Sequence, residues 1–575
     1  MSRRRAASAL LLCLLLLQNL TALGQQPTPT PPPPTPVRPA AQATPQPTPT
    51  TDPIERIKEE GLKRSQLMQT LSHITEVIGP RLTGSPGLKR ANIWTRDKLS
   101  EWGLTNAHLE AWGPFGRGWT LRRFSAEVTE PLAFPLLAYP RAWSPGTKGA
   151  LTGEVFYIEA KTEEELQKYK GRLKGAIVLT GAVRELRAKF DPVAQRLSEK
   201  ELLELANAPD PATVARRPAR QRTPEEIAAA KFEDRKTQFY YEEGVGLLAS
   251  ASVGGDGGML QFVQSASVPQ PFDTPFEKRI GPWRADAPAI IPQIGVSNDH
   301  FNRLVRMLRA GQRVRMNVNL AVEFHSDDLM SYNTVAEIAG SDLKDEVVML
   351  GAHLDSWHLA TGATDNAAGV AMMMEAVRIL RALNLQPRRT IRIALWSGEE
   401  QGLLGSRAYV REHFGPVTGG DESTVVNAIS GAAPSPTATP AAPPIYKTEY
   451  DKFNVYFNAD SGTGKIRGIY LQGNEPLRPT FRRWLQPFRE LGAETITVSN
   501  AGGSDFLSFD AIGLPGLDFL QDDLEYGTRT WHSNQDTLDR IQADDVKQAA
   551  VIIAAFVYNA AMSDQRLPRK PARTN

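Results

Sequence analysis

Residues 347–401 read VVMLGAHLDSWHLATGATDNAAGVAMMMEAVRILRALNLQPRRTIRIALWSGEEQ, and this stretch decides the fold. Val347–Leu350 is a short apolar run, which predicts a buried strand. Apolar side chains then recur at three- and four-residue spacing from Val370 to Leu380. This pattern predicts an amphipathic helix that ends before Pro387. Thr390–Trp396 is rich in branched and aromatic residues and predicts a second strand.

The strand–helix–strand order brings polar residues to one edge of a sheet. Two parallel strands joined by a helix have their carboxyl ends at the same edge, where ligands of open α/β sheets bind. Here that edge receives His353, Asp365, Glu399 and Glu400. Three carboxylates and one imidazole would repel one another strongly without a cation, and together they are a common zinc-binding set. The sequence therefore predicts a metal site at this edge.

Three short motifs occupy the stretch in a fixed order. They are His353-Leu354-Asp355 after the first strand, GATDNAAG at Gly362–Gly369, and WSGEE at Trp396–Glu400. In this order and at these strand ends, they resemble the M28 family of zinc peptidases, and most closely its carboxypeptidase Q-type members. Those members usually have two aspartates where this chain has Asp365-Asn366, whereas many other M28 proteins have Asp-Asn. The metal site is unaffected by this departure, but the subfamily and its substrate are less defined.

The resemblance implies a fold and a division of the chain. The implied fold is the zinc exopeptidase fold, an α/β fold with a mixed, largely parallel sheet and helices on both faces. Lys174–Leu179 (KGAIVL) resembles an element of protease-associated domains, which implies an inserted, mostly-β domain of that kind. The predicted segments are a signal peptide (1–24), a Pro/Thr-rich disordered linker (25–53), the first part of the peptidase domain (54–130), the inserted domain (131–291) and the catalytic part (292–565). Within the insert, residues 184–243 form a charged helical excursion, which is either a surface segment or a lid over the cleft.

The resemblance also implies a role for each site residue. The ligands implied for two Zn²⁺ ions are His353 and Asp460 on the first ion, Glu400 and His532 on the second, and Asp365 bridging both. Glu399 is the implied general base, which activates a water that bridges the metals. Asp355 is expected to orient His353 through its other ring nitrogen. The family also implies a cis peptide bond between Asp365 and Asn366. Cobalt or manganese would fit the same ligands.

Composition and the N-terminus limit the partners and the location. The formal net charge is +2, so there is no large basic field and we expect no nucleic-acid partner. Arg3–Arg5, the apolar run 6–17 and the small-residue site Ala22-Leu23-Gly24 predict a secretory signal peptide. We therefore expect a secreted or periplasmic protein with no stable membrane insertion after cleavage. The alternatives are an uncleaved anchor, which the polar residues at 18 and 19 interrupt, and a lipoprotein attached at Cys13.

These observations predict an exported di-zinc exopeptidase that hydrolyses dipeptides or short peptides. Short peptides are the expected partners, and related proteins are often homodimers. One alternative is a glutaminyl-peptide cyclotransferase, which shares the fold but uses one zinc. Another is a non-catalytic binding protein on the same scaffold, which should have lost ligands. The complete set of five ligands with a base, and the inserted domain, favour the peptidase.

Overall fold

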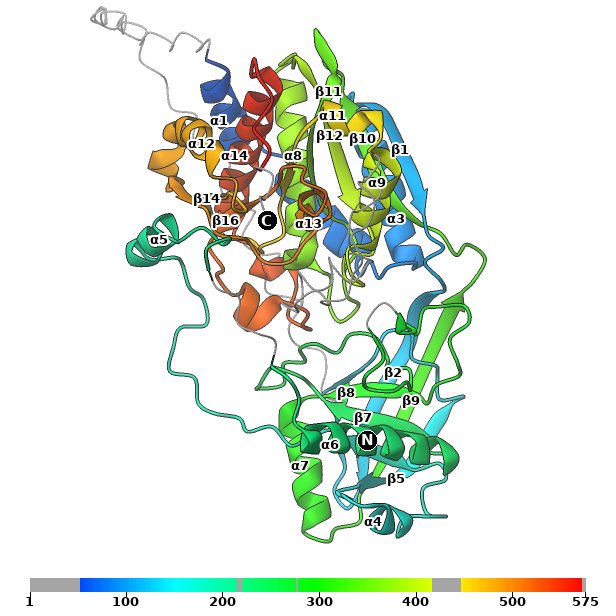
Figure 1. Ribbon diagram of the computed structural model, residues 1–575. Coiled ribbons are helices and arrows are strands. Elements are labelled where there is room, and N and C mark those ends of the chain that lie inside the picture. Colours follow the sequence, from blue (N-terminus) through cyan, green and yellow to red (C-terminus); the bar gives the residue numbers. More distant parts are fainter. Residues whose placement is uncertain (1–51, 215–219, 276–277, 416–445, 571–575) are drawn as a thin grey trace, which may run out of the picture. The chain divides into compact units, whose positions relative to one another are not determined.

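The computed structural model describes residues 52–214, 220–275, 278–415 and 446–570. The predicted signal peptide and nearly all of the predicted linker lie outside these residues. Two eight-stranded sheets organise the described chain (Figure 1). The first sheet carries the residues predicted for the active site, and strands of residues 118–325 form the second.

The first sheet is mixed and largely parallel, which confirms the predicted α/β fold. Its central strands β12, β11, β13 and β16 run parallel. The β1 and β10 strands pair antiparallel with their neighbours, and β14 is antiparallel to β16 but parallel to β15. The strand order is β1 (Thr105–Trp112), β10 (Ser331–Ile338), β12 (Arg389–Trp396), β11 (Leu343–His353), β13 (Phe453–Asn458), β16 (Gly516–Gln521), β14 (Ile466–Tyr470) and β15 (Thr495–Thr497).

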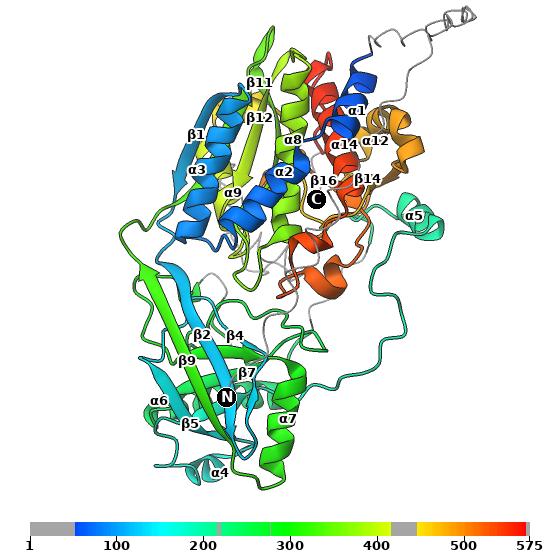
Figure 2. The same ribbon diagram turned by 180° about the vertical axis from the view of Figure 1, so that it is seen from behind.

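Helices cover both faces of this sheet. Figure 2 shows the face covered by α1 (Pro53–Lys63), α2 (Leu67–Ser72), α3 (Pro86–Glu101), α8 (Ala368–Ala382) and α14 (Ala543–Met562). The α12 helix (Arg478–Leu485) packs on the same side. The opposite face carries α9 (Leu404–Phe414), α11 (Thr448–Lys452) and α13 (Phe506–Asp510). The helix predicted from the periodicity at 370–380 is therefore confirmed.

The position of β11 explains its apolar sequence. This strand lies between β12 and β13 in the sheet. Helices cover both of its faces. Val348 and Leu350 belong to the apolar core on the α8 side, and Met349 belongs to the core on the α9 side. A strand buried on both faces is read as a continuous apolar run rather than an alternating one. The apolar part of the strand leads directly to His353, its last residue.

The N-terminal and C-terminal helices of the described chain pack against each other. Gly61 of α1 faces Val551 of α14 so closely that a Cβ at this position would lie 2.3 Å from the valine side chain. Only a glycine allows this approach, because real Cβ atoms do not come that close to other heavy atoms. The peptidase core is therefore closed by segments from the two ends of the described chain.

The second sheet shows that the inserted segment is longer than predicted. Its strand order is β3 (Phe134–Pro135), β2 (Gly118–Glu130), β9 (Arg315–His325), β5 (Ala150–Tyr157), β6 (Ile177–Thr180), β7 (Leu247–Ala251), β8 (Gln293–Val296) and β4 (Ala138–Pro140). The long strands β2 and β9 pair antiparallel from Gly118↔His325 to Glu130↔Arg315. They lie outside the predicted limits 131–291 yet belong to this sheet. The boundaries therefore move to about 118 and 325, because strand pairing rather than composition defines the unit.

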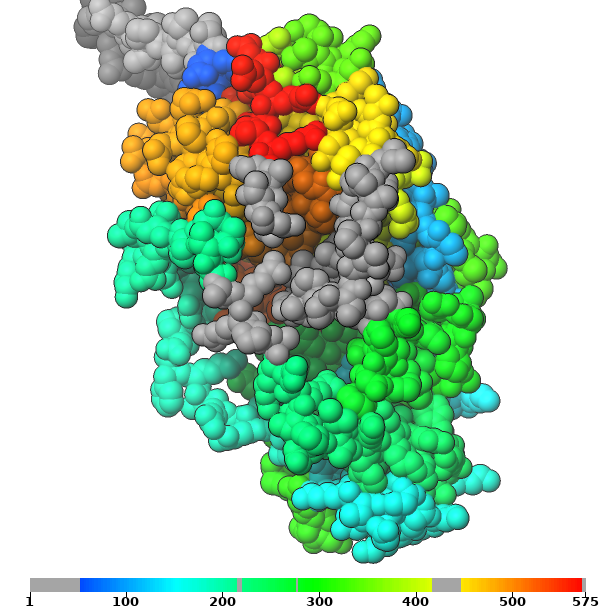
Figure 3. Space-filling model, viewed as in Figure 1, coloured from blue at the N-terminus to red at the C-terminus, as the bar shows by residue number. Residues whose placement is uncertain are grey.

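The charged excursion 184–243 divides into two parts. The later part forms the long helix α6 (Pro224–Glu242), which packs on the second sheet through Phe239 and Tyr240. The short helix α4 (Glu163–Gln167) belongs to the same apolar cluster. The α7 helix (Asn298–Arg309) packs on that sheet through a separate apolar cluster. The earlier part, which leads to α5 (Glu199–Ala206), contacts the peptidase part instead: Gln195 and Leu524 exchange two backbone hydrogen bonds, and Arg196 pairs with Asp522 at 2.9 Å. Figure 3 shows α5, in turquoise, beside the orange C-terminal segments. The excursion thus joins the two sheets of the described chain.

Among the described residues, no helix is both long enough and apolar enough to cross a bilayer.

A histidine between β1, α9 and α11 should make stability depend on pH. His413 lies 3.0 Å from Glu110 and 3.4 Å from Glu449. Burial opposes its charge, but hydrogen bonds to these two carboxylates raise the pKa of His413 to about 9. Its contribution is therefore complete below the unfolded pKa of about 6.5 and is lost as the pH rises through about 9. We expect His413→Gln to remove about 2 kcal/mol of stability at pH 6.5 and almost none at pH 9.5.

Thermal unfolding of both proteins at pH 6.5 and 9.5 measures this difference. His73→Gln is the matched control, because His73 stacks on Trp94 and burial lowers the pKa of its imidazole. Because this shift is opposite to that of His413, replacing His73 should not produce a loss of stability confined to the lower pH. An equal loss at both pH values in His413→Gln would show that the imidazole is not charged at pH 6.5.

Candidate active site and metal centre

The carboxyl ends of three adjacent parallel strands deliver most of the site. His353 is the last residue of β11, Glu399 and Glu400 follow β12, and Asp460 follows β13. Asp365 lies in the kinked segment Ala363–Ala367 directly before α8, and its own φ of −129° and ψ of 86° are not helical. The bond between Asp365 and Asn366 is cis, as predicted. The strand–helix–strand unit therefore brings the four predicted edge residues together.

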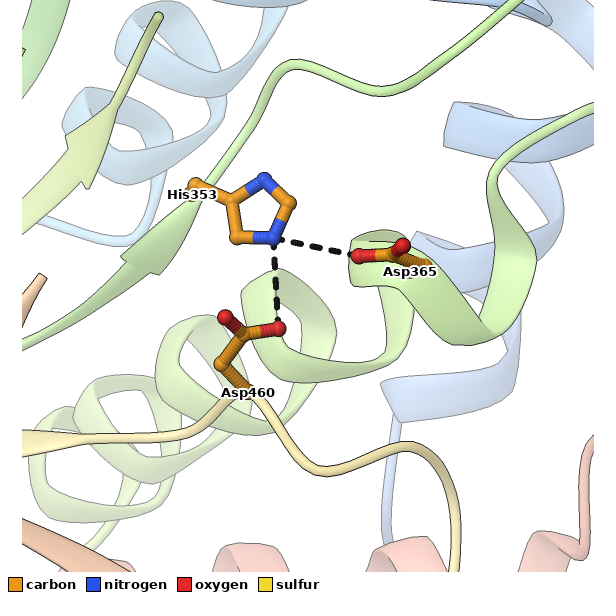
Figure 4. Close-up of side chains that lie close together, drawn as sticks. All are labelled: His353, Asp365 and Asp460. Atoms are coloured by element: carbon orange, nitrogen blue, oxygen red, sulfur yellow. Dashed lines mark hydrogen bonds and ion pairs between the residues drawn. The ribbon is translucent and has the colours of Figure 1, made fainter. Parts of the chain in front are cut away.

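Two groups of side chains meet at Asp365. In the first group, His353 Nε2 lies 3.2 Å from Asp365 Oδ1 and 3.2 Å from Asp460 Oδ1 (Figure 4). In the second group, His532 Nε2 lies 3.2 Å from Asp365 Oδ2 and 2.9 Å from Glu400 Oε2. The two oxygens of Asp365 thus face different imidazoles. All five residues predicted as ligands form two three-residue clusters that share Asp365.

The five side chains are almost entirely buried. Their exposed fractions are 1% for His353, 5% for Asp365, 8% for Asp460, 3% for Glu400 and 12% for His532. Buried carboxylates at these distances are unfavourable without a compensating cation. Glu400 Oε1 is buried and has no hydrogen-bond partner in the part of the chain that the structure describes. The donor set of two imidazole nitrogens and carboxylate oxygens fits a pair of divalent cations of the zinc type.

Burial and crowding shift the acid–base behaviour of the site. Burial raises the pKa of Glu399 well above its ordinary value, and the carboxylates of Asp460 and Asp505 raise it further, while His353 opposes them. Burial also raises the pKa of Glu400, to about 7. Asp365 behaves differently, because hydrogen bonds with both imidazoles hold its pKa well below the usual range despite its burial. Adjacent glutamates therefore have different surroundings: Glu399 faces His353 and Glu400 faces His532.

Asp355 does not hold His353 in the predicted way. His353 Nδ1 lies 3.0 Å from the main-chain carbonyl oxygen of Asp355 but 3.7 Å from its carboxylate. The carboxylate instead accepts hydrogen bonds from the main-chain N–H groups of Glu399 and Glu400, both at 3.3 Å. It also accepts one from Thr83 Oγ1 at 2.9 Å. The Asp355 side chain therefore positions the turn that carries the two glutamates, and its main chain orients the imidazole.

Several positioning residues were not predicted from the sequence. Asp536 accepts hydrogen bonds from the main-chain N–H groups of Thr364 at 2.6 Å and Asp365 at 3.2 Å, so it fixes the shared ligand. Arg81 is fully buried and donates to the carbonyl oxygens of Gly79, Leu354, Thr361 and Gly362. The motifs HSNQDT and GPRLTGS contain these two residues and Thr83, so motif membership was the available signal. Their contacts, however, span up to 281 residues of sequence.

His358 packs away from the site. Although His358 lies only five residues after His353 in the sequence, it is only 5% exposed. Its Nε2 lies 2.8 Å from the carbonyl oxygen of Pro140, and its ring meets those of Trp119 and Tyr139. Burial lowers the pKa of its imidazole to about 4. His358 is therefore a packing residue against the inserted segment and does not line the site.

Known proteins resemble the part of the chain that carries the site. Residues 333–557 match the model of peptidase family M28. The chain carries an M28 peptidase domain. All five predicted metal ligands and Glu399 lie inside the matched residues. The matched part of the chain, residues 333–557, is thus similar to M28 peptidases, as the sequence motifs predicted.

Relatives of the M28 domain include proteins of similar length. Carboxypeptidase Q from Mus musculus is 26% identical over 511 residues, which cover 88% of each chain. Leupeptin-inactivating enzyme 1 from Streptomyces exfoliatus is 28% identical over 257 residues, which cover 41% of this chain and 50% of the relative. The crystal structure of a peptidase M28 precursor from Shewanella amazonensis SB2B superimposes with a TM-score of 0.59 at 24% identity, covering 90% of this chain and 98% of the other. This last likeness supports the fold of both parts of the chain.

Proposed function

We propose that this M28 peptidase is an exported di-zinc exopeptidase that hydrolyses dipeptides or short peptides. The observation that carries the proposal is the placement of Asp365, whose two oxygens each lie 3.2 Å from a different histidine nitrogen. A bridging carboxylate between two clusters is the arrangement that two neighbouring cations need. The first ion would be held by His353 and Asp460, and the second by Glu400 and His532.

The neighbouring side chains supply the acid–base chemistry. Two zinc ions bound there would polarise the scissile carbonyl group and lower the pKa of a water molecule. Glu399 would accept the proton of the attacking water and pass it to the nitrogen of the leaving amine. Its raised pKa suits both steps, because the carboxylate takes up a proton more readily than an ordinary glutamate. Asp355 would keep Glu399 and Glu400 in place through their N–H groups.

The burial of the site supports small substrates. None of the five predicted ligands is more than 12% exposed, so a folded polypeptide segment cannot lie across them. A dipeptide or a free chain end can enter a site of this kind, because only a few residues have to lose contact with solvent. Names of the relatives include both carboxypeptidase and aminopeptidase, which accords with cleavage near a chain end.

The basic and apolar residues at the N-terminus support export.

The experiment measures zinc content and substrate range together. The purified chain without residues 1–24 is tested on unblocked dipeptides, N-acetylated dipeptides and aminoacyl amides, and its bound zinc is counted. We expect two zinc ions per chain and cleavage of the unblocked peptides. A chain that binds two zinc ions and cleaves none of these substrates would contradict the exopeptidase proposal, and cyclisation of N-terminal glutamine would then be measured. A chain that binds fewer than two ions would contradict the two-metal site.

A further inference from the structure

A segment of the inserted domain holds the loop that carries His532. The holding segment is Leu260–Gln264, and the held loop is Trp531–Asn534. The hydrogen bonds between them are Phe262 N to His532 O at 2.9 Å, Leu260 N to Asn534 Oδ1 at 2.8 Å, Asn534 N to Leu260 O at 3.0 Å and Gln261 Nε2 to Trp531 O at 3.2 Å. A ligand predicted for the second metal ion is thus fixed by residues that do not belong to the M28 domain.

The holding segment also restricts the imidazole itself. The ring of Phe262 meets that of His532 edge-on, with centroids 5.4 Å apart and an interplanar angle of 87°. Both residues have left-handed backbone conformations, with φ of 56° for Phe262 and 52° for His532. Non-glycine residues adopt this conformation rarely, and surrounding contacts have to maintain it. The orientation of His532 therefore depends on its partner segment.

The remaining ring nitrogen of His532 faces Gln264. Its Nδ1 lies 3.1 Å from the side-chain amide nitrogen of Gln264, while its Nε2 faces Asp365 and Glu400. Nε2 can bind a metal only when its lone pair is free, so the ring proton must then be on Nδ1. An N–H group at Nδ1 needs an acceptor, which an amide nitrogen cannot be. A half-turn of the Gln264 amide, which changes almost no shape, presents the oxygen instead.

The two predicted metal-binding imidazoles differ in the hydrogen-bond partner of their Nδ1 atoms. His353 Nδ1 lies 3.0 Å from the carbonyl oxygen of Asp355, two residues along the same chain segment. His532 Nδ1 has Gln264 of the inserted domain, 268 residues away in sequence. The main chain of Gln264 is fixed within the insert, because its main-chain carbonyl oxygen accepts a hydrogen bond from Ala142 N at 3.0 Å. Support for the first cluster is therefore local, and support for the second cluster comes from the insert.

From this asymmetry we propose that Gln264 is a positioning residue for His532, and that the inserted domain thereby controls metal binding at the second cluster alone. The inference rests on the proposed two-zinc function and adds to it. The amide oxygen of Gln264 would accept from Nδ1–H when Nε2 binds zinc. The insert is then a structural part of the metal centre and not only a neighbour of the cleft.

Zinc titration of two variants tests this role. The full chain without residues 1–24 is freed of metal and titrated against a chromophoric chelator, which gives each zinc dissociation constant. We expect Gln264→Leu to weaken one of the two constants by about 10–100-fold and to leave the other unchanged. We expect Gln264→Glu, which has the same shape and only acceptor oxygens, to bind that zinc at least as tightly as the wild type. Gln270→Leu is the matched control, because the hydrogen bonds of the Gln270 side chain to described residues both go to Ile280, within the insert.

Each outcome decides the inference separately from the proposed function. Constants within twofold of wild type in Gln264→Leu would overturn it. An equal loss in Gln264→Glu and Gln264→Leu would also overturn it, because the acceptor oxygen would then be irrelevant. Thermal unfolding of the metal-free proteins shows whether a variant has lost its fold rather than its zinc. A wild-type chain with a single zinc would contradict the two-zinc proposal, and the response of that one constant to Gln264→Leu would still decide the role of Gln264.

Discussion

Glu399→Gln is expected to lower kcat about a thousandfold while zinc content stays at the wild-type value. The amide has the size of the carboxylate but cannot accept a proton from water. Glu399 is not one of the residues in the two ligand clusters, so its replacement should leave both intact. Peptide hydrolysis at saturating substrate and zinc counted on the same samples provide the measurement. The substrate dissociation constant should change little, because proton transfer is lost and not binding.

Glu400→Gln is the matched control, since it makes the same chemical change one residue along the chain. Glu400 lies 2.9 Å from His532 and belongs to the second cluster. We expect this variant to lose zinc as well as activity, and excess zinc to restore part of the activity. If Glu399→Gln lost zinc to the same extent, the different roles assigned to the two glutamates would be wrong.

Arg81→Met is expected to lower the free energy of unfolding by about 4 kcal/mol and to weaken zinc binding. Arg81 donates to Leu354 O at 2.7 Å, directly after His353, and to Gly362 O at 2.8 Å, shortly before Asp365. Methionine fills a similar volume but leaves these buried carbonyl oxygens without donors, and each such oxygen costs about 1–3 kcal/mol. The segments that carry the two ligands would then lose their common support.

Urea unfolding and zinc titration of Arg81→Met measure the two effects. Arg90→Met is the control, because Arg90 is exposed and makes only one long hydrogen bond, to Ile78 O at 3.4 Å. It should change stability by less than about 0.5 kcal/mol. An Arg81→Met protein as stable as the control would show that the four carbonyl oxygens find other partners.

Local patterns were enough to predict the centre of the molecule. The apolar run Val347–Leu350 and the helical spacing at 370–380 predicted β11 and α8, because burial on both faces or on one face determines those patterns directly. The strand–helix–strand unit predicted that His353, Asp365, Glu399 and Glu400 meet at one edge, because parallel strands bring such ends together. The resemblance to M28 peptidases implied the full ligand set, including Asp460 and His532. The resulting site contains the five predicted ligand residues in two clusters.

Contacts between distant segments were not predictable in the same way. The alternating residues of β2 fit any antiparallel strand, so nothing in residues 118–130 indicates which sheet they join. The carboxylate of Asp355 was expected on His353 and instead binds two N–H groups after β12. Gln264 does not belong to a recognised sequence motif, and its role was identified from its contact with His532 in the structure. In each case the partner lies on another element, and single-sequence periodicity carries no information about such pairs.

The pairing of α1 with α14 has a consequence for synthesis on the ribosome. The first helix of the described chain leaves the exit tunnel early. Gly61 can pack against Val551 only after nearly the whole chain has been synthesised. The second sheet needs only residues 118–325, all of which emerge before most strands of the first sheet. The inserted domain should therefore fold on the nascent chain while α1 to α3 and β1 still lack their later partners α8, α14 and β10. Because the holding segment Leu260–Gln264 is then already in place, the loop at His532 would dock onto a finished surface as one of the last events of folding.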